Sequence, residues 1–297
     1  MRAPIRYHAD NRDDPTGFKA RARAHQSRFR QDVMKTDFAD LYGTKLSIDD
    51  GHVGMHNFHP LGWEAVKARY PGQRQTLYCD VLRSEHIPFN LFSPLENHKQ
   101  VLAAVLNKFM QQTIQTVDRI VIEFAPQPKA NYLNDATSFD AYIEYTHTSG
   151  ALGIIGIEVK YTEGDYKIGN NEALAVQNPD SPYWRVTRQS NIHKPDCYSQ
   201  LITDRFRQVW RNQLLGESIK LRHPDKWKHF TLAMIYPSGN THIEEVTQEY
   251  RQLLVAPTNT SFIPISYQSY LQACNECISD DELNGWVNWC VRRYAHA

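Results

Sequence analysis

The alternation of apolar and polar residues predicts a β-hairpin in the middle of the chain. Two runs, 138–146 and 152–162, are joined by the turn-forming sequence HTSGA. A period of two residues is typical of a strand that buries one face. The apolar residues that share a face are Phe139, Ala141, Ile143 and Tyr145 in the first run and Ile155, Ile157, Val159 and Tyr161 in the second. Apolar runs predict further strands at 117–125, 230–236 and 262–265.

Apolar positions at helical spacing predict the helices around these strands. They are expected at 16–31, 62–70, 96–113, 198–215, 243–254, 266–277 and 280–295. By contrast, the stretch 164–197 shows little periodicity and is rich in Gly, Asn, Pro and Ser. It is therefore expected to be a long irregular connection, which is either functional or a simple linker.

The hairpin register brings three charged residues together. If the apolar positions of both runs cover one core, even-numbered residues pair with even-numbered ones, because a slip of one residue would expose one apolar set. Asp140 then lies opposite Glu158 or Lys160, with Cβ atoms about 4.5–5.5 Å apart in the closest pairing. Gly156 is on the same face, where it would leave room for a ligand.

Two carboxylates and one ammonium on one patch suit a hard divalent cation. Mg²⁺ takes oxygen ligands and needs only one or two carboxylates beside substrate phosphates and water. Asp140 and Glu158 would supply the carboxylates, and the backbone carbonyl of Val159 could add a third oxygen. Lys160 would lie near a metal-bound water or a phosphate. The alternative interpretation is a solvated strand face held by a salt bridge.

Composition narrows the class of protein. A chain of 297 residues, 41% of them hydrophobic, is long enough for a sizeable core. No apolar run approaches the roughly 18 residues of a membrane-spanning helix, and the N-terminus lacks the apolar region of a secretory signal, so a cytoplasmic protein without a membrane partner is expected. Basic and acidic residues balance at 33 each, so nucleic acid could be attracted only by local patches. The five cysteines are expected to be reduced thiols between helices; a zinc site at Cys274 and Cys277 is the alternative.

An Asp on one strand and Glu-x-Lys on the next resemble the PD-(D/E)XK nuclease superfamily, which has the restriction-endonuclease-like fold. The segments IGIEVKYTE and LRSEHIPFNLFSPL are similar to a group of bacterial restriction-endonuclease-like proteins. The expected order from 96 to 236 matches the αβββαβ core of that α/β fold, a mixed four-stranded sheet flanked by helices. Phe139 stands where the family often has Pro. The expected division is a basic helical extension packed on the core at 1–81, and a nuclease-like domain with a C-terminal helical region at 82–297.

The resemblance implies a metal-dependent nuclease that hydrolyses phosphodiester bonds. The expected activity is that of a DNA endonuclease, with Mg²⁺ or Mn²⁺ as the cofactor. Because cutting a duplex usually requires two copies in this superfamily, a homodimer is expected. The alternatives are a ribonuclease, or a nucleic-acid-binding module that keeps the fold and lacks catalysis.

The resemblance also implies further site residues. Glu85 is expected to be a third acidic ligand; its alternative role is to cap a helix. On the helix after Glu-x-Lys, Gln208 and Arg211 would approach the catalytic patch and steady the substrate backbone, although a surface arginine in a salt bridge would look the same. Arg188, in the irregular stretch 164–197, would contact phosphates from a lid over the site. A cationic side of the first helix, formed by Lys19, Arg23 and Arg30, could also contact phosphates or simply be solvated.

Overall fold

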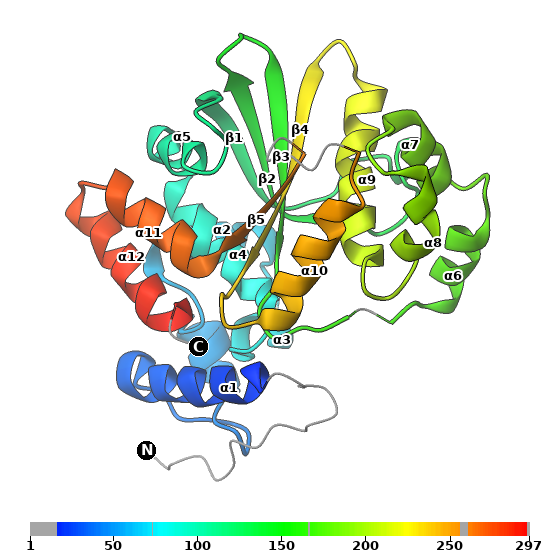
Figure 1. Cartoon of the computed structure of the whole chain (residues 1–297). Helices are drawn as coiled ribbons and strands as arrows, with labels where there is room; N and C mark the ends of the chain where they lie inside the picture. Colours follow the sequence, from blue (N-terminus) through cyan, green and yellow to red (C-terminus); the bar gives the residue numbers. More distant parts are fainter. Residues whose placement is uncertain (1–16, 73, 166, 256–260, 296–297) are drawn as a thin grey trace.

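A five-stranded mixed sheet lies at the centre of the protein (Figure 1). The computed structural model describes residues 17–72, 74–165, 167–255 and 261–295. The strands, in their spatial order, are β1 (Ile114–Phe124), β2 (Phe139–His147), β3 (Leu152–Val159), β4 (Trp227–Tyr236) and β5 (Phe262–Ser266). The first three are antiparallel to one another, while β4 is parallel to β3 and β5 is parallel to β4.

The predicted core order is present, but the sheet has one strand more than expected. Helix α5 (Lys99–Asn107), strands β1 to β3, helix α9 (Arg207–Arg222) and strand β4 follow one another as α-β-β-β-α-β. The short run at 262–265, expected as a strand but not counted in the core sheet, pairs with β4 from Leu232 to Tyr236. It joins the sheet because its backbone groups complete the hydrogen bonding of the β4 edge.

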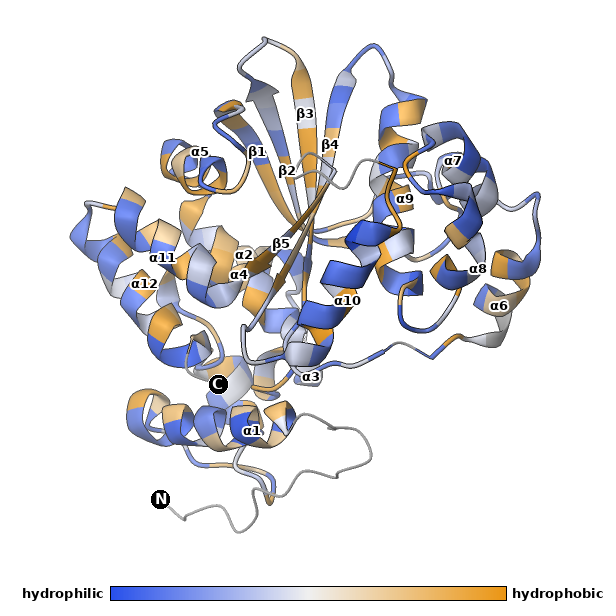
Figure 2. Cartoon of the chain, in the orientation of Figure 1, coloured by the Kyte–Doolittle hydropathy of each residue, from blue (hydrophilic) through white to orange (hydrophobic). Residues whose placement is uncertain are grey.

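Helices lie on both faces of the sheet, although Thr116, Asp118 and Arg119 of the edge strand β1 are exposed. One layer contains α2 (Trp63–Arg69), α4 (Ile87–Phe92), α5, α11 (Tyr267–Cys277) and α12 (Asp281–Tyr294); the other contains α6 (Asn170–Gln177), α7 (Pro182–Ser190), α8 (Tyr198–Leu201), α9 and α10 (Thr241–Gln252) (Figure 1). Figure 2 shows apolar residues gathered on the central strands and polar ones on α10. On the face of the hairpin expected to be polar, Gly156 and Glu158 of β3 are buried beneath α9, whereas Asp140, Glu144 and Thr146 of β2 are half-buried.

Most of the predicted apolar face of the hairpin is found. Ala141, Ile143 and Tyr145 lie in the core beneath α5 and α11. Phe139 is the exception, because its ring lies in the second core, beneath α9. There it occupies the space beside Gly156, where an added Cβ would overlap the ring. Gly156 thus makes room for Phe139 and not for a ligand, which corrects the expectation from the sequence.

The region expected to be irregular contains two helices, α6 and α7. Ser181 precedes α7 and Pro182 occupies its first position, a common helix start. Tyr183 and Val186 turn inwards, and Trp210 of α9 packs against Tyr183. Each helix is only two turns long, so its apolar positions are too few to give a periodic signal in the sequence.

The single helix expected at 198–215 is divided into α8 and α9. The break contains Thr203, which donates a hydrogen bond to the carbonyl of Gln200, and Asp204, which accepts one from the backbone N–H of Ile168. Short polar side chains that bond to the backbone compete with helix formation. The break brings Asp204 within 2.6 Å of Arg207 at the start of α9.

The N-terminal helix α1 (Phe18–Phe29) runs into a π-helical turn, and a further short helix is α3 (Gln75–Cys79). Thr16, the residue predicted to cap α1, lies outside the described residues. Arg30 is buried and donates to the carbonyls of Gly43 and Thr36, so it does not belong to the expected cationic side. Lys19 and Arg23 instead line a cavity of about 740 Å³ beside Thr162 and Glu163, which follow β3.

Arg293 of α12 joins the two ends of the described chain. Its guanidinium, fully buried, donates to the carbonyl oxygen of Asn57 at 2.7 Å, to the Asn57 side chain and to Oε1 of Gln26 at 3.3 Å. The rings of Phe29, Trp289 and Tyr294 lie around it. Apolar side chains from 18–81 and from the rest of the chain share one core. The division at residue 81 remains a prediction.

The chain after β3 is braced by both ends in the same way. The Tyr161 hydroxyl accepts a hydrogen bond from Gln26 at 2.8 Å, and the Lys160 carbonyl accepts one from the Tyr267 hydroxyl at 2.5 Å. Gln26 belongs to α1 and Tyr267 to α11. The segment that follows Glu158 is therefore held between α1 and α11.

Gly216→Ala is expected to destabilise the protein, although alanine is the better helix former. Gly216 lies inside α9, and an added Cβ would overlap the ring of Phe230 on β4. Overpacking costs typically about 1–3 kcal/mol, which outweighs the roughly 1 kcal/mol of helix propensity gained. Urea denaturation measures the free energy of unfolding.

The matched control is Gly285→Ala in α12, where nothing lies within 4 Å of an added Cβ. This variant should gain roughly 0.5–1 kcal/mol. A Gly216→Ala protein as stable as the control would contradict the close approach of α9 to β4.

Candidate active site

The register of β2 and β3 places Asp140 directly opposite Glu158. Ala141 pairs with Ile157 and Tyr142 with Gly156, and this register, continued by one residue, sets Asp140 opposite Glu158. This is one of the two pairings expected from the sequence. The Asp140 Oδ2 accepts a hydrogen bond from the Val159 backbone N–H at 2.6 Å, which fixes the carboxylate at the junction of the two strands.

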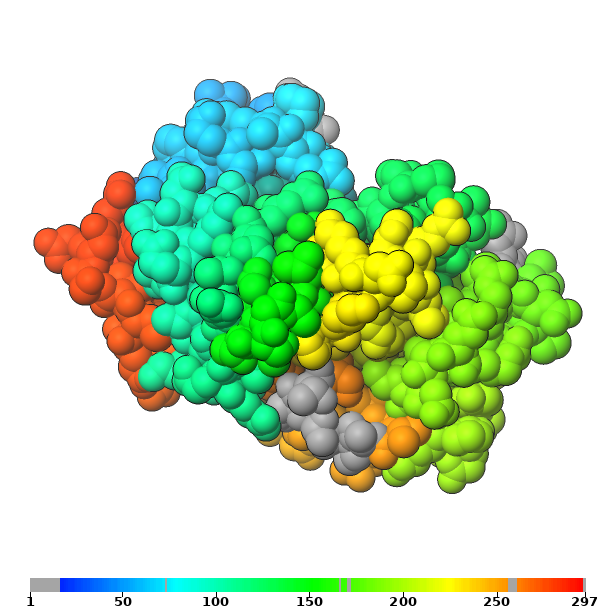
Figure 3. Space-filling model, turned by 90° about the horizontal axis from the view of Figure 1, so that it is seen from above, coloured from blue at the N-terminus to red at the C-terminus, as the bar shows by residue number. Residues whose placement is uncertain are grey.

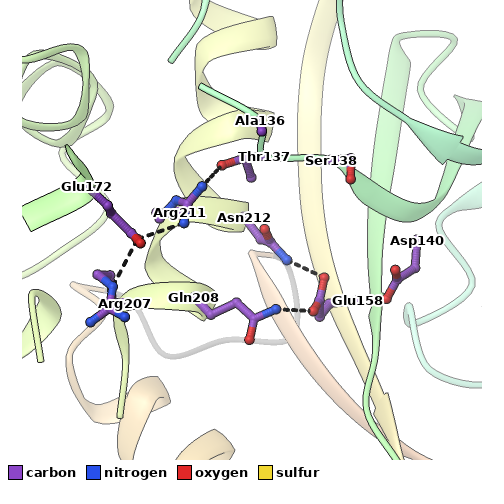
Figure 4. Close-up of a pocket in the computed structure, with 10 residues that line it drawn as sticks. All are labelled: Ala136, Thr137, Ser138, Asp140, Glu158, Glu172, Arg207, Gln208, Arg211 and Asn212. Atoms are coloured by element: carbon purple, nitrogen blue, oxygen red, sulfur yellow. Dashed lines mark hydrogen bonds and ion pairs between the residues drawn. The ribbon is translucent and has the colours of Figure 1, made fainter. Parts of the chain in front are cut away.

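The site is at the end of the sheet that is remote from the β2–β3 turn. Asp140 is the second residue of β2 and Glu158 the last but one of β3, whereas the turn 148–151 joins the other ends of the two strands. Seen from above, that turn (green) and the start of β4 (yellow) reach the surface between the two helical layers (Figure 3). Figure 4 shows the residues around Asp140 and Glu158.

A network from α9 holds Glu158 and Lys160, each of which is 5% exposed. The Lys160 Nζ lies 2.7 Å from Glu158 Oε1 and donates to Gln208 Oε1 at 2.7 Å. Gln208 Nε2 donates to Glu158 Oε1 at 2.6 Å, and Asn212 Nδ2 donates to Glu158 Oε2 at 2.5 Å (Figure 4). Gln208, expected to touch the substrate, here fixes the carboxylate and the ammonium in place.

Asn212 was not singled out from the sequence, although a signal was present. Gln208 and Asn212 are four residues apart in α9, so their side chains share one face of the helix. Two amides at this spacing can each donate a hydrogen bond to a different oxygen of one carboxylate. The pattern becomes informative only once Glu158 is known to lie beneath the helix.

A third carboxylate, Glu123, lies across from Asp140 on β1. Ile122 pairs with Ala141 and Phe124 with Phe139, which sets Glu123 opposite Asp140. Glu123 has a φ of 59°, an unusual backbone conformation for a residue other than glycine. The sequence analysis did not predict Glu123 as a site residue. The feature that could have indicated it is a single carboxylate inside the apolar run IVIEFA.

Burial, together with neighbouring carboxylates, raises the pKa values of Asp140 and Glu123. Burial, reinforced by the Glu158 and Glu123 carboxylates, raises the pKa of Asp140 well above its usual value. Burial raises the pKa of Glu123 to about 7; the guanidinium groups of Arg74 and Arg69 oppose this shift, and the Glu158 and Glu85 carboxylates add to it. A divalent cation would relieve the repulsion between Asp140 and Glu158 by pairing with both.

The donor set fits a hard cation bound by few protein ligands. Asp140 and Glu158 bring two carboxylates to one point, which satisfies the one or two that Mg²⁺ usually takes from a protein. Within 17–72, 74–165, 167–255 and 261–295, no three His, Cys, Asp or Glu residues gather in a metal-binding group. Val159 contributes its N–H to Asp140, and the use of its carbonyl as a ligand remains a prediction.

Two predicted site residues are not brought to this point. Glu85 accepts a hydrogen bond from Thr76 at 3.2 Å and lies 3.5 Å from Arg74, so its carboxylate is directed to those partners. Arg188 is exposed on α7 and donates to the carbonyl of Pro179 at 2.9 Å. It faces away because α7 is a helix with its buried side on α9, whereas the prediction assumed an open loop.

A polar cavity of about 290 Å³ opens beside the Asp140–Glu158 pair. Its lining residues are Ala136, Thr137, Ser138, Asp140, Glu158, Glu172, Arg207, Gln208, Arg211 and Asn212 (Figure 4). Arg211 is thus at the site as predicted, but its Nη atoms are paired with Asp135, Thr137 and Glu172. The arginine is held by carboxylates on the cavity wall.

The sheet is mixed, with Asp140 on its second strand and Glu158 near the end of its third, two residues before Lys160. Helix α9, which lies in the connection between the third and fourth strands, covers these residues. Together these features define a restriction-endonuclease-like α/β protein. The family model of the PD-(D/E)XK nuclease superfamily matches residues 8–296. The chain belongs to this superfamily, which confirms the resemblance seen in its sequence. No curated protein and no solved structure matches the chain.

Two other features bear on the expectations from composition. All five cysteines are free thiols, and Cys277 alone among them is not buried. In the described part of the chain, every helix is too short or too polar to cross a bilayer.

Proposed function

We propose that this protein is a metal-dependent nuclease that hydrolyses phosphodiester bonds in DNA. The observation that carries the proposal is the pairing of Asp140 with Glu158 at the mouth of a polar cavity, with the Lys160 ammonium 2.7 Å from Glu158. Membership of a nuclease superfamily supports a nucleic-acid substrate. A cytoplasmic location belongs to the same proposal.

Asp140, Glu158 and the carbonyl oxygen of Val159 would hold the metal ion, Mg²⁺ or Mn²⁺. When bound, such an ion makes a coordinated water more acidic and offsets negative charge on the phosphate. Asn212 and Gln208 keep the two oxygens of Glu158 in a fixed orientation. The protein thus presents a preformed pair of ligands instead of assembling them at each turnover.

Lys160 acts as a fixed positive charge. Burial lowers the pKa of Lys160, but the Glu158 and Glu163 carboxylates more than offset this effect, so its pKa is raised. The ammonium therefore stays protonated at neutral pH and is suited to stabilise negative charge on the phosphorane or to orient the attacking water. It is not suited to remove a proton.

Arg211, and the helix face it shares with Gln208, would steady the phosphate backbone. Two copies of the chain would be needed to cut both strands of a duplex, so we propose a homodimer on DNA. The second candidate is a nucleic-acid-binding module without catalysis, because the Glu158–Lys160 ion pair could also be purely structural. RNA is the alternative substrate.

The deciding experiment incubates the protein with supercoiled plasmid, single-stranded DNA and RNA in Mg²⁺, Mn²⁺ or EDTA. Nicking of the plasmid that requires the metal supports the proposal. Cleavage of RNA alone would move the substrate to RNA. Binding without cleavage under every metal condition would favour the binding module.

Metal addition is expected to stabilise the protein more at pH 8 than at pH 6. Asp140 has a raised pKa, and a proton on it must leave before the carboxylate can bind metal. Each pH unit below that pKa lowers the apparent affinity about tenfold. Thermal unfolding with Mg²⁺ or EDTA at both pH values measures the effect; an equal gain at both would contradict metal binding by Asp140.

A further inference from the structure

Glu172 of α6 bridges two arginines inside the cavity. Its Oε1 lies 2.9 Å from Arg207 Nε and 2.7 Å from Arg211 Nη1 (Figure 4). The side chain of Arg207 is 1% exposed and that of Arg211 is 20% exposed. A carboxylate oxygen shared by two guanidinium groups has the environment that a phosphate oxygen would occupy.

Each arginine has a second anchor that does not depend on Glu172. Arg207 Nη1 lies 2.6 Å from Asp204 Oδ1, and Arg211 Nη2 lies 2.9 Å from Asp135 Oδ2 and 2.7 Å from Thr137 Oγ1. Departure of Glu172 would therefore leave both guanidinium groups in position. The Arg211 Nε is also buried and has no hydrogen-bond partner in the described part of the chain.

The charge of the cavity makes Glu172 a barrier to an anionic ligand. Ion pairs in and around the cavity join several carboxylates to three cations. The cations are Lys160, Arg207 and Arg211, and the carboxylates are those of Asp135, Asp140, Glu158, Glu172 and Asp204. A divalent cation on Asp140 and Glu158 would offset two of these negative charges. Withdrawal of Glu172 would then remove a further negative charge that repels a phosphodiester.

The position of helix α6 allows the Glu172 side chain to move out of the cavity. Val176 anchors the C-terminal half of α6, where the Trp184 Nε1 also donates to the Val176 carbonyl at 2.6 Å. Leu174, in contrast, is 69% exposed. Beyond its own backbone, Glu172 is tied to the body of the protein by the two ion pairs with α9. A ligand that replaces those pairs releases the side chain without unfolding the anchored turn.

We propose that Arg207 and Arg211 form a subsite for one phosphate of the nucleic-acid strand, and that Glu172 occupies this subsite until the strand displaces it. The subsite adjoins the Asp140–Glu158 pair, so the phosphate it binds is a neighbour of the one to be cut. The inference rests on the proposed nuclease function and adds how that function is gated. The ligand chemistry is a phosphate ester, which a free nucleotide would share with a strand.

Glu172→Gln tests the displacement, because it removes the competing charge and keeps the shape of the side chain. Binding of a short single strand, a nucleoside monophosphate and inorganic phosphate is measured in EDTA with Asp140 unchanged, because the proposed cleavage requires metal and no strand is then cut. The strand should bind on the order of tenfold more tightly to the Glu172→Gln protein. In the otherwise wild-type chain, kcat/KM for strand cleavage should rise by a similar factor.

Two variants act as controls. Glu249→Gln removes a carboxylate that lies 2.7 Å from Arg205 on the outer surface, and it should leave strand binding unchanged. Arg211→Lys should weaken strand binding and should abolish the gain from Glu172→Gln when the two are combined, because lysine cannot present a fork to the phosphate. This double variant separates a phosphate subsite from general loss of negative charge.

The outcomes distinguish the inference from the function on which it rests. Unchanged or weaker strand binding by a folded Glu172→Gln protein overturns the inference, even if the wild-type protein cuts DNA. Tighter strand binding together with an absence of cleavage by the wild-type protein upholds the subsite and overturns the nuclease. A gain for the monophosphate and inorganic phosphate but not for the strand overturns the nucleic acid as occupant. If Glu172→Gln does not fold, unaltered strand binding by Arg211→Lys overturns the subsite.

Discussion

Asp140→Asn is expected to lower metal-dependent DNA cleavage by at least about 10³-fold, equivalent to roughly 4 kcal/mol of activation free energy. Asparagine can still accept the hydrogen bond from the Val159 N–H, so the strand junction should keep its geometry. It lacks the negative charge that would pair with a divalent cation, and only Glu158 would remain as a carboxylate ligand. Initial rates of plasmid nicking in Mg²⁺ measure the loss.

The same substitution should stabilise the metal-free protein at alkaline pH. Because the pKa of Asp140 is raised in the folded state, the native protein binds more protons than the unfolded chain, and stability falls as pH rises from the unfolded value towards the folded one. Asparagine carries no such penalty. We expect the variant to gain free energy of unfolding relative to the wild type at pH 8 and to gain little at pH 4.

Glu144→Gln is the matched control for Asp140→Asn. Glu144 lies on the same strand at another even-numbered position, 3.4 Å from Arg119 and outside the cavity. It should alter neither cleavage nor the pH dependence of stability. Retention of full activity by Asp140→Asn would remove Asp140 from the metal site, and an equal stability change at both pH values would contradict its raised pKa.

Arg293→Met should cause the largest loss of stability in this series, about 3–5 kcal/mol. The substitution keeps much of the side-chain volume but leaves the buried side-chain oxygens Asn57 Oδ1 and Gln26 Oε1 without their donor, while the Asn57 carbonyl keeps its hydrogen bond from Asn90. Each buried acceptor left unsatisfied costs roughly 1–3 kcal/mol. Urea denaturation measures the loss, with the exposed neighbour Arg292→Met as control, which should stay within about 0.5 kcal/mol of wild type.

The shape of the Arg293→Met transition also tests the predicted division at residue 81. If α1 and the segment after it are one cooperative unit with the rest, unfolding stays a single transition at lower urea. If 1–81 is a separable extension, α1 should become sensitive to protease before the sheet unfolds. A loss below 1 kcal/mol would show that Arg293 does not hold the two ends together.

The sequence was most informative where one geometric rule sufficed. The alternation of apolar residues predicted the hairpin. The pairing of even-numbered residues with even-numbered ones then placed Asp140 opposite Glu158, as in the structure. The period of 3.6 residues put Gln208 and Arg211 on one helix face, and both line the cavity. These inferences use contacts between neighbouring elements, which local patterns in a chain can specify.

What could not be predicted depends on contacts between distant segments. Glu172 and Asp135 reach Arg211 from loops and a short helix separated from it by 39 and 76 residues in the chain. Nothing in the local pattern of those segments distinguishes a carboxylate that will meet an arginine from one that will face water. Arg188 was misplaced for the converse reason, because the helix that turns it outwards is too short to be recognised.

The bracing of Lys160 and Tyr161 by α11 and α1 has a consequence for biosynthesis. Translation delivers the hairpin that carries the proposed metal site long before Tyr267, so a nascent chain that has emerged only as far as β4 lacks the hydrogen bond from Tyr267 to the Lys160 carbonyl. If the protein is the nuclease proposed above, a truncated chain ending after β4 is expected not to nick plasmid. Completion of the polypeptide would then itself be a requirement for cleavage.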